Sequence, residues 1–205
     1  MKRYIFLTIF LSLLLGWLAL RFNPSQSFTE GLVGQPVDLI PGQGAENGVD
    51  EVLEKLLYRS LFSYNDEGKI EKDLAANYKI SQSGRVYTVE IGDFFWRDGK
   101  PITSTDIIST FIQAPAFSDI RIEQEGEKQV RFILQNPLSS FLSVLTAPIA
   151  PAHFRDLPLN KLGSSLFYIK ELRREGGRFP NWYFLMRGKG NLRYLTCAFM
   201  PTKAI

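Results

Sequence analysis

The chain opens with an uncharged, mostly apolar run over residues 4–20, preceded by the basic pair Lys2 and Arg3. A helix of these 17 residues would cover about 25 Å, slightly less than the ~30 Å hydrocarbon layer of a membrane. Residues 24–27, Pro-Ser-Gln-Ser, would end the helix and carry a small-x-small pattern typical of a cleavage site. The pattern predicts that residues 1–27 are a signal peptide or a membrane anchor, with the rest of the chain extracytoplasmic. A buried core helix is the alternative, but the run has no polar face.

After residue 27 the apolar positions mostly alternate in short segments, which is typical of strands. Residues 78–91 and 120–134 alternate on both sides of a turn sequence and predict β-hairpins. A further strand is expected at residues 28–33. Helical spacing predicts a helix over residues 49–62, a cap at Thr103 or Ser104 predicts one that runs to about residue 113, and an apolar run predicts a short one over residues 138–146. The pattern predicts an α+β fold with a mixed or antiparallel sheet and flanking helices.

Charge is distributed unevenly along the chain. The 24 basic and 21 acidic residues leave a net charge of +3, which is too small to indicate nucleic-acid binding. Nine of the basic residues but only two of the acidic ones lie in residues 161–205. Such a basic segment could contact anionic lipid or nucleic acid, but it is more often solvated surface. No nucleic-acid partner is predicted.

Few residues are suited to metal or catalytic chemistry. The chain has one cysteine, Cys197, and one histidine, His153, which excludes an intrachain disulfide framework and most histidine-based metal sites. A triad of Ser164, His153 and an aspartate would lack the G-x-S-x-G elbow that exposes a nucleophilic serine. The sequence therefore predicts no enzyme, no catalytic residue, no metal and no cofactor.

Residues 96–107 read W-R-D-G-K-P-I-T-S-T-D-I. An Asp-Gly turn, the stiffening Pro101 and a helix cap at Thr103 or Ser104 indicate a structural role, with Asp106 in the first helical turn. This segment resembles the signature of the family 5 extracellular solute-binding proteins, the peptide/nickel-type receptors of ABC importers. Five further segments resemble that family in the correct order: residues 31–41, 57–62, 73–78, 130–141 and 148–153.

The resemblance implies that residues 28–172 form the first lobe of a type-II periplasmic-binding-protein fold. It implies that the protein captures a solute, an oligopeptide, without catalysis and passes it to an ABC permease in the membrane. It also implies that the protein lies in the periplasm or at the outer face of the cytoplasmic membrane. A membrane-anchored extracytoplasmic interaction module without transport activity is the alternative function.

The sequence also departs from the family pattern. Residues 163–167 read G-S-S-L-F where the family has G-[ST]-G-P-[FY], and the likeness becomes faint beyond Arg173. Family receptors are much longer and close two lobes on a ligand. We therefore expect a truncated lobe, from a fragmentary or frame-disrupted gene, with residues 173–205 as a divergent basic tail.

The resemblance also implies a set of ligand-binding residues. In the family, the loop after the first L-x-P turn reaches the ligand, and this loop maps onto Ala45, Glu46 and Asn47. Glu46 would pair with a ligand amine and Asn47 would bond peptide groups, whereas the alternative makes both of them solvated loop residues. Trp96 is the fourth candidate, and core packing is the alternative for it.

Overall fold

The computed structural model describes residues 10–12, 14, 26–33, 36–37, 39–42, 47–175, 181–187 and 192–200. Most of the predicted signal or anchor in residues 1–27 lies outside these ranges. Within them, no helix is both long and apolar enough to cross a membrane.

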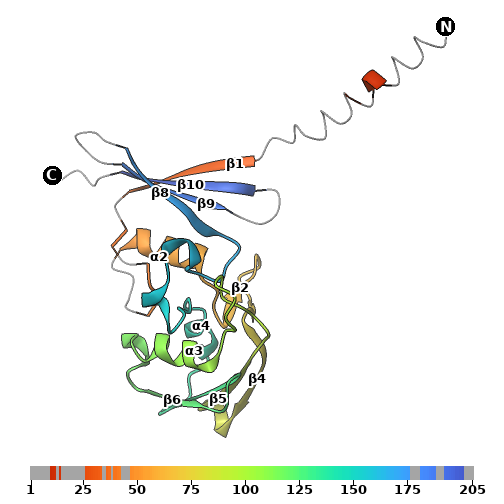
Figure 1. Cartoon of the computed structure of the whole chain (residues 1–205). Helices are drawn as coiled ribbons and strands as arrows, with labels where there is room; N and C mark the ends of the chain where they lie inside the picture. The colour runs from red at the N-terminus through yellow and green to blue at the C-terminus, as the bar shows by residue number, and fades with distance from the viewer. Residues whose placement is uncertain are drawn as a thin grey trace, which may run out of the picture.

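An antiparallel sheet forms the lower half of the molecule as drawn in Figure 1. Its strands, in spatial order, are β4 (Ala75–Ser81), β5 (Val86–Ile91), β7 (Gln129–Leu134) and β6 (Ile120–Gln124). The hairpins β4–β5 and β6–β7 are the two predicted from alternation, and both are confirmed. A short hairpin, β2 (Phe62–Tyr64) and β3 (Ile70–Lys72), precedes this sheet in the chain.

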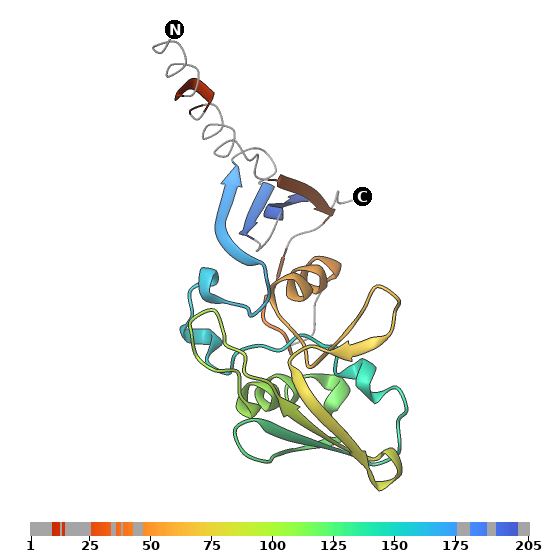
Figure 2. The same ribbon diagram turned by 90° about the vertical axis from the view of Figure 1, so that its right-hand side faces the viewer.

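A second sheet lies at the other end of the molecule (Figures 1 and 2). Its order is β1-β10-β9-β8, and its strands are β1 (Gln26–Val33), β10 (Leu192–Met200), β9 (Asn181–Arg187) and β8 (Tyr168–Glu175). β1 runs parallel to β10, while the other neighbours are antiparallel. The segment 173–205, which sequence reasoning separated as a tail, thus supplies β9 and β10.

Helix α2 (Gly48–Leu57) lies between the two sheets in both views. The Asn47 side chain accepts hydrogen bonds from the backbone N–H groups of Val49 and Asp50, at 2.8 and 3.0 Å, and so begins the helix. The helix ends at Leu57, five residues before the predicted end, because Tyr58 is extended. The prediction was wrong there because the backbone after Leu57 pairs with distant segments, as Ser60 does with Pro148.

The lower sheet packs against helices α3 (Ser104–Phe111) and α4 (Phe141–Val144). Inward-facing residues of β7 alternate with partly exposed ones, as the period of a strand requires. Four rings fill the interface between sheet and helices, with centroids 4.1 to 6.4 Å apart: Phe111, Phe117, Phe132 and Phe141. Short 3₁₀ helices join these elements: η1 (Gln82–Gly84), η2 (Pro115–Phe117), η3 (Phe154–Asp156) and η4 (Leu159–Lys161).

Candidate ligand-binding site

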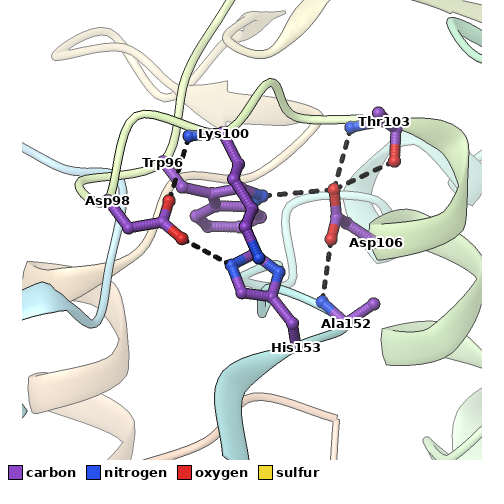
Figure 3. A network of polar contacts seen from close by, with 7 residues as sticks. All are labelled: Trp96, Asp98, Lys100, Thr103, Asp106, Ala152 and His153. Atoms are coloured by element: carbon purple, nitrogen blue, oxygen red, sulfur yellow. Dashed lines mark hydrogen bonds and ion pairs between the residues drawn. The ribbon is translucent and has the colours of Figure 1, made fainter. Parts of the chain in front are cut away.

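A buried polar network holds the W-R-D-G-K-P-I-T-S-T-D segment in place (Figure 3). The Asp106 carboxylate accepts from Trp96 Nε1 at 3.1 Å and from the backbone N–H of Thr103 at 2.8 Å through one oxygen. Its other oxygen accepts from the backbone N–H of Ala152 at 2.8 Å. Because this carboxylate is buried and joins three segments, it fixes the start of α3 against the turn that carries Trp96.

A second carboxylate of the segment bonds the only histidine of the chain (Figure 3). Asp98 Oδ2 lies 2.7 Å from His153 Nε2, and Oδ1 accepts from the backbone N–H of Lys100 at 3.1 Å. Burial alone would raise the pKa of Asp98, but the bond to His153 and the backbone bond outweigh it and lower that pKa below its ordinary value of 3.8. His153 thus ties the 151–153 turn to the Asp-Gly turn.

Arg97 lies in the sequence between Trp96 and Asp98, whose side chains are fixed by Asp106 and His153. Its Nη2 donates to the carbonyl oxygen of Ser165 at 2.8 Å, and its guanidinium carbon lies 4.3 Å from the ring centre of Tyr168. Its Nε is buried without an acceptor among the described residues. Desolvation lowers the pKa of Arg97 from its ordinary value, although the interaction with Tyr168 acts in the opposite direction.

Arg97 and Trp96 border a cavity of about 1010 Å³. The end of α2, strand β2, the turn at residues 95–97 and the loop at residues 164–166 form its walls. The polar side chains in its lining are Lys55, Tyr58, Arg59, Ser60, Ser63, Tyr64, Asp73, Arg97, Thr146, Ser164 and Ser165.

Two of the cations that line the cavity are already paired. Arg59 forms an ion pair with Asp73, in which Nε donates at 2.7 Å and Nη2 contacts the same carboxylate. Lys55 pairs with Glu51 at 2.6 Å, one helical turn away on the exposed face of α2. Of the three cations in the cavity lining, Arg97 is therefore the one that has no carboxylate partner among the described residues.

The cavity also has an exposed apolar rim. Phe95, Leu166 and Tyr64 line it and are 62%, 59% and 54% exposed, respectively. Side chains of this size are usually buried, and their clustering around one opening is typical of a binding surface. The cavity therefore offers apolar contact at its mouth and fixed polar groups within.

The structure describes two of the four predicted site residues, Asn47 and Trp96, and places them apart. Ala45 and Glu46 lie outside the described residues. Asn47 caps the start of α2, whereas Trp96 lies at the cavity, near the opposite end of that helix. The ten residues of α2 correspond to about 15 Å. Trp96 is 3% exposed and packs in the core, but it also contributes to the cavity wall.

Sequence reasoning missed Arg97 as a candidate. It interpreted residues 96–107 as scaffold, an interpretation with which the network of Asp106 and Asp98 agrees. The sequence nevertheless contained a signal for Arg97. It lies between Trp96 and Asp98, and if the side chains of these two neighbours point into the protein, the side chain of Arg97 points away from the core. Ser164 was considered only as a nucleophile, but its Oγ accepts from the backbone N–H of Arg59 at 3.0 Å.

The described residues contain no cluster of three or more His, Cys, Asp or Glu side chains able to hold a metal.

No family model matches the chain. Individual proteins do match. The probable D,D-dipeptide-binding periplasmic protein DdpA of Escherichia coli is 25% identical over 179 residues, covering 74% of this chain and 34% of that protein. The glutathione-binding protein GsiB of Escherichia coli is 26% identical over 149 residues, covering 66% of this chain and 29% of that protein.

Solved structures with the same fold include a periplasmic binding protein and an oligopeptide-binding protein. AgaA of A. tumefaciens, in complex with agropinic acid, superposes with a TM-score of 0.69 at 22% identity, over 85% of this chain and 40% of that one. AppA of Bacillus subtilis, in complex with a nonapeptide, superposes with a TM-score of 0.67 at 16% identity, over 87% of this chain and 41% of that one. The predicted type-II periplasmic-binding-protein fold is confirmed.

These comparisons also bear on activity and length. By their names, the matching curated proteins are binding proteins rather than enzymes, which agrees with the prediction that the chain is not an enzyme. The chain spans about a third of the length of the curated relatives it matches.

Proposed function

We propose that this chain, which is related to the family 5 solute-binding proteins of ABC transporters, contributes the first lobe of a receptor for a peptide or peptide-like solute. The receptor acts outside the cytoplasmic membrane and delivers its ligand to an ABC permease. Residues 1–27 serve as the export signal or as the anchor that keeps it at the membrane. The names of the relatives, which bind a D,D-dipeptide and glutathione, support a small peptide-like ligand.

The cavity beside Trp96 and Arg97 is the observation that carries this proposal. Its volume of about 1010 Å³ lies at the upper end of the range for small-ligand sites. A peptide presents charged termini and amide groups together with apolar side chains. Fixed polar groups inside the cavity and the apolar rim of Tyr64, Phe95 and Leu166 match these two kinds of surface.

The loop residues Ala45, Glu46 and Asn47 remain candidates for ligand contact. Asn47 begins α2 and Tyr58 follows its end, so the loop and the cavity are separated by the length of that helix. A ligand that touched both would extend for about 15 Å, the length of roughly five extended residues. Glu46 would then pair with the amine of an oligopeptide whose other end enters the cavity.

The test is a ligand titration of the full chain, purified in mild detergent. The ligands are D-alanyl-D-alanine, glutathione and a pool of di- to pentapeptides. We expect at least one of them to raise the unfolding temperature in a concentration-dependent way, because a ligand bound only by the folded state stabilises it by mass action. Isothermal titration calorimetry then gives the affinity. Absence of both a shift and a heat signal with all three would contradict the proposal.

The alternative function, an anchored interaction module without transport activity, is favoured by one observation. The rim of Tyr64, Phe95 and Leu166 is exposed and apolar, as a protein-binding surface is. The same titration separates the two functions, since a module of this kind has no reason to bind free peptides.

A further inference from the structure

We propose that Arg97 anchors a free carboxylate of the ligand in the cavity, so that the receptor selects solutes with an anionic terminus. This inference rests on the proposed function and deepens it, because it names the chemical group that the site recognises.

The first argument is charge balance. Lys55 is neutralised by Glu51 and Arg59 by Asp73, while Arg97 has no carboxylate partner among the described residues. The cavity wall therefore carries one uncompensated positive charge. An anionic ligand group would neutralise it, and a cationic group would be repelled.

The second argument is the set of available donors. A guanidinium carries five N–H donors in a planar fork, and Nη2 of Arg97 uses one of them on Ser165. Nη1 has no acceptor in the described part of the chain, and Arg97 lines the cavity. The end of the fork can therefore give two parallel hydrogen bonds, through Nη1 and Nη2, to the two oxygens of a carboxylate.

The third argument is that the guanidinium is already positioned. Trp96 and Asp98 on either side are fixed by Asp106 and His153 (Figure 3). The ring of Tyr168, 4.3 Å from the guanidinium carbon, restricts the plane of the fork. Because little side-chain freedom is left to lose, binding an anion at Arg97 has a small entropic cost. Burial lowers the pKa of Arg97 by penalising its charge, and a bound anion would relieve that penalty.

The neighbouring rim adds a further preference. Phe95 lies two residues before Arg97 and borders the same cavity together with Leu166. A carboxylate at Arg97 thus places the side chain of the residue that carries it beside an apolar surface. The favoured ligand is a peptide with a free C-terminal carboxylate on an apolar residue.

The experiment compares D-alanyl-D-alanine with its C-terminal amide by calorimetry on the full chain and on variants Arg97→Gln and Arg97→Lys. Lys100→Gln is the charge-matched control, because Lys100 is exposed, close in sequence and absent from the cavity wall. We expect the wild type to bind the acid about 10- to 100-fold more tightly than the amide. Arg97→Gln should lose that difference, Arg97→Lys should keep part of it, and Lys100→Gln should keep all of it.

Equal binding of acid and amide by the wild type would overturn the anchor and leave the proposed function standing. If a folded Arg97→Gln variant bound D-alanyl-D-alanine as tightly as the wild type does, the anchor would likewise be overturned and the proposed function would stand. If the wild type bound neither probe while glutathione or the peptide pool still bound, repeating the comparison with the glutathione C-terminal amide and the amidated pool would decide the question. If no ligand bound at all, both proposals would fail. Should Arg97→Gln not fold, the acid–amide comparison on the wild type and on Arg97→Lys decides alone.

Discussion

Asp98 and Asp106 show how single side chains organise the turn that carries Arg97. Both belong to the segment that suggested the family, and neither faces the cavity wall. Asp106 accepts from Trp96, Thr103 and Ala152, while Asp98 bonds His153. Their role is to fix the backbone and the residues on either side of Arg97, whose own side chain lines the cavity.

The acid dependence of stability tests the role of Asp98. Because its pKa is lowered in the folded state, its ionised form stabilises the fold above the ordinary value of 3.8, and this contribution disappears as the pH falls through the lower, folded value. We expect the difference in unfolding free energy between wild type and Asp98→Asn to shrink as the pH falls below 3.8.

Urea unfolding monitored by tryptophan fluorescence at several pH values measures this difference. Asp93→Asn is the control, because the Asp93 side chain is 97% exposed. A difference that stayed constant down to the lowest accessible pH would show that Asp98 is not stabilised by its partners.

At the scale of elements, the end of α2 depends on a loop more than a hundred residues away. The carbonyl oxygen of Leu57 accepts from the backbone N–H groups of Ser164 and Ser165, both at 3.0 Å. Ser165 in turn accepts from Arg97. The loop therefore connects the end of the helix to the guanidinium at the cavity.

Gly163 allows this connection. Its φ is +93°, and a Cβ atom at this position would lie 2.3 Å from the carbonyl oxygen of Leu57. This explains why the first glycine of the family's G-[ST]-G-P pattern is present in this chain although the second glycine and the proline are not. We expect Gly163→Ala to lower the unfolding free energy by roughly 2–4 kcal/mol, since it combines left-handed strain with a backbone clash.

Gly126→Ala is the matched control. Gly126 has a nearly equal φ of +95°, but a Cβ atom there would meet no other atom within 4 Å, so we expect a loss of only about 1–2 kcal/mol from backbone strain. Urea unfolding of the two variants under the same conditions gives both values. Equal losses would show that the contact with Leu57 adds nothing.

At the scale of the molecule, the first and last described strands meet. β1 pairs in parallel with β10, and β10 lies between β1 and β9 in the sheet. Among the described residues, this sheet contacts the rest of the molecule chiefly through β8, which lies beside α2 and η4, whereas the other sheet packs against α3 in the main hydrophobic core. The two sheets are therefore expected to differ in stability.

Removal of residues 188–205 tests this difference. The deletion takes away β10, so β1 and β9 lose their shared neighbour. We expect the backbone amides of β1, and those of β9 that face β10, to exchange rapidly with solvent, while those of β5 and β7 stay protected. Hydrogen exchange followed by mass spectrometry measures both sets, and a chain lacking only residues 201–205 is the control. Loss of protection in β5 and β7 would instead indicate one cooperative unit.

The sequence by itself determined the local elements and the class of the molecule. Alternation predicted the hairpins β4–β5 and β6–β7 because their partners are adjacent in the chain, and the 96–107 segment indicated the family because its turn and cap are local features. Tertiary structure alone decided three things: the end of α2 at Leu57, the pairing of β1 with β10 and the place of Arg97 at the cavity. Each of them depends on contacts between residues far apart in the chain, and no periodicity within a short segment records such contacts.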